Sequence, residues 1–184
     1  MPFASAEKRP YPPRMTRHPA AEVVEYDGSW PAAFAEVHAY VWPAVRDVAV
    51  AVEHVGSTAV PGLAAKPIID LDVVVAEPEA VAAAVSALAG IGYVHRGDQG
   101  ITGREAFAAP ESLPEHALYV VARDSQPYKD HIEFRDYLRA HPQVAERYAD
   151  EKRRLAHLLL ADREAYVNGK GWLVEEVLVA ARRG

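Results

Sequence analysis

The sequence contains no cysteine, and this absence excludes several kinds of site at once. Disulfides, thiolate metal centres and cysteine nucleophiles all need the missing side chain. Any metal must therefore be held by Asp, Glu or His. Where carboxylates dominate such a ligand set, they favour a hard cation, and we expect Mg²⁺ or Mn²⁺.

Long apolar runs and an excess of positive charge are also missing. No apolar stretch approaches the roughly 20 residues of a membrane span, and the first residues lack the apolar segment of a secretory signal. A formal net charge of -6 disfavours extended nucleic acid as a partner, because that binding needs a basic surface. We therefore expect a cytoplasmic protein with no membrane association.

The 184 residues, 50% of them hydrophobic, suffice for one domain with a substantial core. Residues 1–20 are rich in proline and arginine and are interpreted as a flexible arm, and residues 21–184 as a single folded domain. Strands are predicted over residues 23–26, 48–55, 68–75, 93–96 and 117–122. Helices are predicted over residues 31–48, 79–88, 128–140, 143–160 and 171–182, with a bend at Pro43 and a link at Asn168-Gly169. This order indicates an α+β fold with a C-terminal helical segment.

Two aspartates stand out in the strand predicted over residues 68–75. Asp70 and Asp72 are two residues apart, so both side chains point to the same face of the sheet. Two neighbouring carboxylates repel each other unless a cation lies between them, and a divalent metal would also bridge phosphate oxygens. The alternative is a strand near a sheet edge that shows its polar face to water. The pair is therefore a candidate metal site.

The turn before this strand carries groups that suit a phosphate. Gly56 allows close approach of the backbone to a ligand, and the amides and hydroxyls of Ser57 and Thr58 can cradle an anion. Lys66 follows as a point charge suited to a triphosphate, although it also fits an ordinary solvated lysine. Together with the two aspartates, this series predicts a nucleotide or other phosphate-containing small molecule as ligand.

The same stretch, HVGSTAVPGLAAKPIIDLDVVV, resembles the signature of the GrpB family, a branch of the nucleotidyltransferase superfamily. The segments EYDGSWPAAF, GREAF, EHALYVV and HIEFRDYLRAHP resemble other parts of that family, so the similarity spans roughly residues 22–182. The resemblance implies a polymerase-beta-like fold, a small mixed sheet flanked by helices. It also implies that Gly56 and Ser57 form the signature turn and that Asp70 and Asp72 bind the metal.

A third carboxylate usually completes the site in active members of this superfamily, on a neighbouring strand. The equivalent strand here, EHALYVV, has no acidic residue within it. His116 stands near its start and is our candidate for a metal-binding or catalytic group in that place. Its alternative role is that of a surface residue.

Further candidates lie outside the signature. His54 either contacts the ligand or is a buried, hydrogen-bonded residue that fixes the turn. Arg104, in a glycine-rich loop, is a candidate clamp for phosphate or carboxylate. Lys152 and Lys170 are expected to close the pocket over the phosphates.

The helix that contains HIEFRDYLR presents a predicted core stripe and a polar face. Phe134, Tyr137 and Leu138 recur at helical spacing and are expected in the core. Arg135, Asp136 and Arg139 are interpreted as ion-pairing residues that anchor the helix, rather than as catalytic ones.

These observations predict a metal-dependent nucleotidyltransferase that moves a nucleotidyl group from a nucleoside triphosphate to an unknown acceptor. Asp70, Asp72 and His116 would be the catalytic residues. The alternative is a catalytically inactive nucleotide- or small-molecule-binding module of the same fold, which the missing third carboxylate favours. A weaker alternative is a partner domain for another enzyme, since a related domain follows dephospho-coenzyme A kinase in some bacteria.

Overall fold

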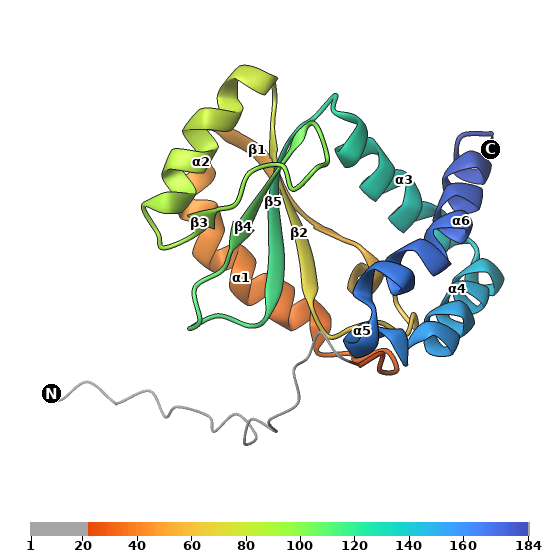
Figure 1. Ribbon diagram of the computed structural model, residues 1–184. Helices are drawn as coiled ribbons and strands as arrows, with labels where there is room; N and C mark the ends of the chain where they lie inside the picture. Colours follow the sequence, from red (N-terminus) through yellow and green to blue (C-terminus); the bar gives the residue numbers. More distant parts are fainter. Residues whose placement is uncertain (1–21, 184) are drawn as a thin grey trace, which may run out of the picture.

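A five-stranded mixed sheet forms the centre of the computed structural model, which describes residues 22–183 (Figure 1). The predicted arm over residues 1–20 lies outside the described residues. The strand order is β1-β2-β5-β4-β3, and only β2 and β5 run parallel to each other. The strands are β1 (Ala49–Val55), β2 (Ile69–Val75), β3 (Val94–His95), β4 (Arg104–Ala108) and β5 (His116–Ala122).

Two helices, α1 (Trp30–Val45) and α2 (Val81–Ala89), cover one face of this sheet (Figure 1). Val37, Val41 and Val45 recur every four residues along α1 and are fully buried. They pack in one core with Leu71 and Val73, which point to the same face of β2. Short 3₁₀ turns, η2 (Ser57–Ala59) and η3 (Pro78–Ala80), follow β1 and precede α2.

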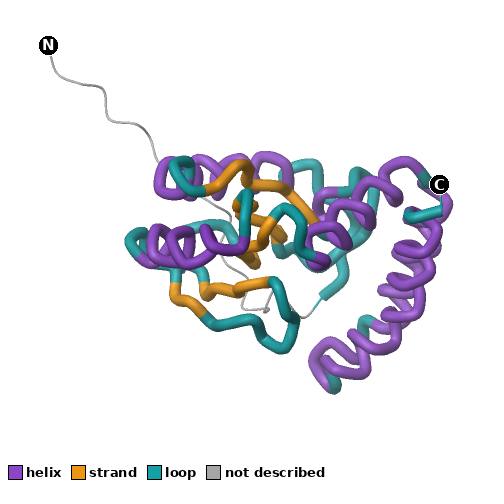
Figure 2. The backbone as a smooth tube through the Cα atoms, turned by 90° about the horizontal axis from the view of Figure 1, so that it is seen from above, coloured by secondary structure: helices purple, strands orange, loops and turns teal. Residues whose placement is uncertain are grey.

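The C-terminal part of the chain forms a second group of helices beside the sheet (Figures 1 and 2). It consists of α3 (Gln126–Ala140), α4 (Pro142–Leu155), α5 (Leu158–Ala161) and α6 (Arg163–Ala181). Phe134 and Leu138 lie in its core, as the helical spacing predicts. Val60, Leu63 and Ala64, from the connection between β1 and β2, belong to the same core. The signature turn is therefore held between the sheet and the helices.

The structure confirms the predicted α+β class and corrects several boundaries. Helix α1 continues through Pro43, as the predicted range does, but ends at Val45 rather than near Val48. Residues 23–26 form a single bridge, Val24 to Ala65, rather than a strand. The glycine-rich segment after β3 is a hairpin that leads into β4, a strand that the sequence analysis did not assign.

The predicted link at Asn168-Gly169 is wrong, since helix α6 runs through it. Gly169 faces Leu155 of α4, and a Cβ atom there would lie 2.9 Å from the Leu155 Cδ1 atom. The glycine therefore permits close packing of two helices instead of ending one. Among the described residues, no helix combines the length and the apolar character needed to cross a bilayer.

Candidate functional site

The site begins at the turn where β1 ends. Gly56 has a φ of 68°, in the left-handed region that favours glycine. A Cβ atom at this position would lie 2.4 Å from the Asp70 Oδ2 atom, so no larger residue fits without displacing the carboxylate. The turn and the first aspartate are thus in direct contact, as the sequence motif predicts.

Asp70 and Asp72 share one face of β2, opposite to Leu71 and Val73. Asp72 is fully buried, whereas Asp70 is partly buried and reaches a cavity. Burial raises the pKa of Asp70 to about 6, against the opposing effect of nearby cations such as His131 and Lys66. Burial also raises the pKa of Asp72. Both carboxylates therefore occupy an environment in which an additional cation stabilises their charged form.

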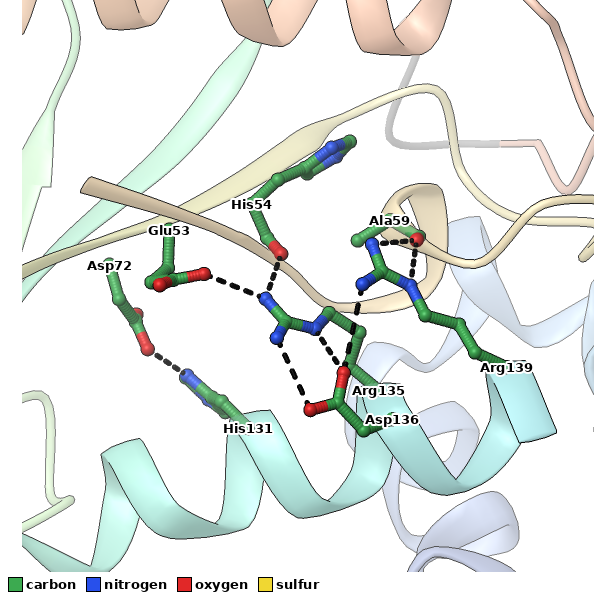
Figure 3. Close-up of polar contacts among 8 residues, drawn as sticks. All are labelled: Glu53, His54, Ala59, Asp72, His131, Arg135, Asp136 and Arg139. Carbon is green, nitrogen blue, oxygen red and sulfur yellow. Dashed lines mark hydrogen bonds and ion pairs between the residues drawn. The ribbon is translucent and has the colours of Figure 1, made fainter. Parts of the chain in front are cut away.

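His131 of α3 supplies part of that positive charge. Its Nδ1 atom lies 2.8 Å from the Asp72 Oδ2 atom (Figure 3). Burial by itself would lower the pKa of His131, but the hydrogen bond and the charges of Asp72 and Asp70 raise it overall. The second oxygen of Asp72, Oδ1, is buried and has no hydrogen-bond partner among the described residues. One acceptor in the centre of the site thus remains unsatisfied.

Helix α3 attaches to the site at three points spaced four residues apart (Figure 3). His131 contacts Asp72, and the Arg135 Nη1 atom lies 2.9 Å from the Glu53 Oε2 atom and 3.0 Å from the His54 carbonyl oxygen. Arg139 donates two hydrogen bonds, of 2.9 and 2.7 Å, to the Ala59 carbonyl oxygen. Residues four apart lie on the same face of a helix, so one face fixes the strand end, the turn and the buried aspartate.

These contacts agree with the predicted anchoring role of Arg135 and Arg139. Asp136 takes part as well, since its Oδ1 atom lies 2.8 Å from the Arg135 Nε atom. His131 was not among the predicted site residues. The four-residue spacing that it shares with Arg135 and Arg139 was the signal in the sequence, but its aspartate partner lies 59 positions away.

His54 fixes the turn and lines neither cavity described below. Its Nε2 atom lies 3.0 Å from the Thr58 Oγ1 atom, and its ring stacks on Phe34 with 4.8 Å between centroids. Burial, with smaller contributions from Arg139 and Arg135, lowers the pKa of His54 to about 4. Of its two predicted roles, the geometry supports the structural one.

Two cavities meet at Ser57, Asp70 and Lys170. The first, here called the large cavity, has a volume of about 530 Å³ and lies between the sheet and the helices α3 and α6. Its wall is largely apolar, with Phe134 among the contributors, and Arg104 reaches it from the start of β4. A cavity of this size suits a small molecule.

The second, here called the lysine cavity, has a volume of about 220 Å³, and Lys66, Lys152 and Lys170 all line it. Lys152 is 2% exposed, and its Nζ atom donates a hydrogen bond to the Ala64 carbonyl oxygen. The Lys170 Nζ atom lies 3.3 Å from the Tyr148 hydroxyl oxygen. Burial, together with the charge of Lys170, lowers the pKa of Lys152. An anion in this cavity would relieve the repulsion between these lysines.

Of the two strands that flank β2, β5 carries an aromatic residue opposite Asp72, whereas β1 carries Glu53, which forms an ion pair with Arg135. In the pairing of β2 with β5, Asp72 is opposite Tyr119 and Asp70 is opposite Ala117. The guanidinium of Arg104 lies 4.3 Å from the centre of the Tyr119 ring. The Arg104 Nε atom is buried without a hydrogen-bond partner in the described part of the chain. The guanidinium of Arg104 thus lies over the side chain that β5 places opposite Asp72.

His116 does not reach the aspartates, which corrects the expectation that it replaces the third carboxylate. It is opposite Ile69 in the pairing of β2 with β5, on the face that the helices α1 and α2 cover. Both ring nitrogens are already engaged, Nε2 at 2.7 Å from the Tyr93 hydroxyl and Nδ1 at 2.7 Å from the Pro114 carbonyl oxygen. The alternation of side chains along β5 sends His116 and Tyr119 to opposite faces.

Within residues 22–183, no group of three His, Asp or Glu side chains is arranged to hold a metal ion. Asp70 and Asp72 provide only two carboxylates. Mg²⁺ is often bound by one or two carboxylates together with substrate phosphates and water, so two acids suffice for a site that the substrate completes.

Comparison with known proteins shows the family of the chain. Residues 20–179 match the family described as GrpB protein. The chain belongs to the GrpB family. It is 32% identical to the crystal structure of the conserved protein GrpB from Enterococcus faecalis, with a TM-score of 0.77 over 87% of this chain and 96% of that one.

Three sequence relatives show similar levels of identity to the chain. The UPF0157 protein YqkA of Bacillus subtilis is 32% identical over 88% of this chain, and the UPF0157 protein PA4798 of Pseudomonas aeruginosa is 35% identical over 85%. This GrpB-family chain spans 47% of the length of YqkA and 66% of that of PA4798. The glutamate-rich protein GrpB of Alkalihalophilus pseudofirmus is 37% identical over 69% of this chain and 76% of its own length.

A more distant structure shares the fold. Cid1, solved in complex with its short product ApU, matches with a TM-score of 0.50 and 10% identity over 72% of this chain and 41% of its own. At this identity the match concerns the fold alone, which is nucleotidyltransferase-like as predicted.

Proposed function

We propose that this GrpB-family chain binds a nucleoside triphosphate with Mg²⁺ (or Mn²⁺) and transfers its nucleotidyl group to an acceptor. The observation that carries the proposal is the meeting of carboxylates and lysines at one place. Asp70 lines both cavities, and Lys66, Lys152 and Lys170 line the cavity on one side of it. Carboxylates and lysines that converge on one point suit a divalent metal bound to a polyphosphate.

The donor set fits the metal. Asp70 and Asp72 would hold it, and the buried Asp72 Oδ1 atom, which has no partner among the described residues, is an acceptor that a cation would satisfy. When bound, the metal would neutralise charge on the phosphates and polarise the reacting phosphorus centre.

The protein's own groups would orient the triphosphate. The turn at Gly56 and Ser57 places backbone amides and a hydroxyl beside Asp70, at the junction of the two cavities. The lysine cavity would accept the β- and γ-phosphates, where positive charge stabilises the departing pyrophosphate. Arg135 and Arg139 would act as positioning residues, since both hold carbonyl groups that flank the turn.

Isothermal titration calorimetry with a nucleoside triphosphate, with and without Mg²⁺, tests the binding step. We expect Mg²⁺-dependent binding that Asp70→Asn weakens at least tenfold. Asp47→Asn is the matched control, because the Asp47 side chain is 92% exposed and lies outside both cavities. Failure of every common triphosphate to bind under either condition would refute the proposal.

A second candidate function is binding of the same ligand without turnover. Two observations favour it: Tyr119 is opposite Asp72 where a third carboxylate was sought, and His131 is already hydrogen-bonded to Asp72. Release of pyrophosphate during incubation with a triphosphate and a pool of small-molecule acceptors separates the two. Tight binding without any release supports the binding module.

A further inference from the structure

The large cavity carries a feature that the proposed function leaves unused, the arginine at its edge. Arg104 lines this cavity and stacks 4.3 Å from the centre of the Tyr119 ring. No ion pair joins it to a carboxylate in residues 22–183, and its Nε atom has no hydrogen-bond partner there. The charge of Arg104 acts on Asp72, but no carboxylate among the described residues lies within ion-pair distance of it. A partly buried guanidinium of this kind can bind an oxyanion, to which its planar fork can donate two parallel hydrogen bonds.

Two other charged groups of the large cavity, Asp130 and His131, already have hydrogen-bond partners. Asp130 accepts hydrogen bonds from Gln126 and from Arg182. His131 uses its Nδ1 atom for Asp72. Lys170, which lines both cavities, has its Nζ atom 3.3 Å from the Tyr148 hydroxyl oxygen. Arg104 is thus the cation of this cavity that does not line the lysine cavity and has no ion-pair partner among the described residues, while Phe134, Val174 and Leu178 provide apolar surface nearby. The wall suits a ligand with an apolar body and one anionic group.

The two cavities would play different parts in the proposed reaction. The attacking and leaving oxygens of a phosphoryl centre lie roughly in line with the phosphorus between them. If the leaving pyrophosphate occupies the lysine cavity, the acceptor approaches from the large cavity, because the two cavities meet at Asp70. Arg104 then lies on the acceptor's side of the reacting centre.

We infer that the acceptor is a small oxyanion, a carboxylate or a phosphate monoester with an apolar body, held by Arg104 in the large cavity. This inference rests on the proposed nucleotidyl transfer. The acceptor oxygen forms a bond to the α-phosphorus, the bond from that phosphorus to the bridging oxygen breaks, and pyrophosphate leaves with the electron pair. No proton is transferred, because the nucleophile is already an anion. A carboxylate at the position of Tyr119 would repel such an acceptor, whereas Tyr119 and Arg104 do not.

Three probes of similar shape test the inference: benzoate, phenyl phosphate and benzyl alcohol. Their affinities for the full chain are measured by ligand-observed NMR, with Mg²⁺ and a non-hydrolysable triphosphate analogue present. We expect benzoate or phenyl phosphate to bind at least tenfold more tightly than benzyl alcohol, and the stronger of the two identifies the anion class. This comparison needs no variant.

Arg104→Gln should remove the preference for the anion, and the affinities for the anion and for the triphosphate analogue are both measured. Arg96→Gln, at an exposed arginine outside both cavities, is the matched control and should change neither affinity. Equal binding of benzyl alcohol and the anions overturns the inference, and so does an unchanged preference for the anion in Arg104→Gln. In both cases the proposed function survives. If the triphosphate analogue itself fails to bind, the proposed function and the inference fail together.

Discussion

The two faces of strand β2 have opposite chemistry although they are built from alternating residues of one segment. Leu71 and Val73 point into the core under α1 and α2, where packing decides their contribution to stability. Asp70 and Asp72 point to the other face, where burial raises the pKa of both carboxylates. One face therefore stabilises the fold, and the other maintains charged groups at a cost in folding free energy. Such a cost is typical of functional sites.

The largest expected loss of stability follows a substitution on the core face of β2. Leu71 is fully buried, so Leu71→Ala removes buried methyl groups and leaves a cavity, which costs about 2–5 kcal/mol. Urea denaturation followed by circular dichroism measures the loss. The variant that remains folded should bind a triphosphate with unchanged affinity. A large loss of binding in the folded variant would show that the two faces are not independent.

The opposite result is expected on the other face for Asp70→Asn. The pKa of Asp70 is raised from 3.8 to about 6, so the folded state binds more protons than the unfolded state between those values. The stabilisation that comes from the raised pKa of Asp70 is therefore present below pH 4, and it is lost as the pH rises through 6. Replacing the ionised carboxylate should stabilise the protein at pH 7.5 by about 1–3 kcal/mol and weaken Mg²⁺-dependent binding at least tenfold. Denaturation curves at pH 4 and pH 7.5 check the sign, since the gain should vanish at pH 4.

The effect of His54, which lies in β1 before the turn, on the free energy of unfolding should depend on pH in the opposite sense. Its pKa is lowered from 6.5 to about 4, so the unfolded state binds more protons within that window. Stability should therefore fall by about 1–2 kcal/mol as the pH drops from 6.5 to 4, after allowance for partial exposure. His54→Gln should flatten this part of the profile in thermal denaturation. An unchanged slope in the variant would assign the acid sensitivity to another group.

The smallest effect on binding is expected for His116, on the core face of β5. His116→Gln breaks the hydrogen bond with the Tyr93 hydroxyl and should cost about 1 kcal/mol of stability. Triphosphate affinity should stay within twofold of wild type in calorimetry. A tenfold loss of affinity would restore His116 as a site residue and contradict its placement on the opposite face.

Local pattern was enough for the parts of the site that lie in one segment. The i, i+2 spacing of Asp70 and Asp72 on a strand fixes their common face, and Gly56 before Ser57 indicates a close approach. The same reasoning failed for His116, because which face a strand's first residue takes depends on the register with its neighbour. It also missed that His131 joins Asp72, since no local rule links residues 59 positions apart.

The sequence by itself determined the family, the α+β class, and the turn and aspartate pair, because each depends on short-range periodicity or on a contiguous motif. Only the tertiary structure decided which side chains line the two cavities. The pairing of β2 with β5 set Tyr119 beside Asp72, and the hairpin into β4 brought Arg104 onto that ring. Side chains of α3, α4 and α6 then line the two cavities that meet at Asp70. These contacts join residues far apart in the chain, and long-range packing rather than local propensity determines them.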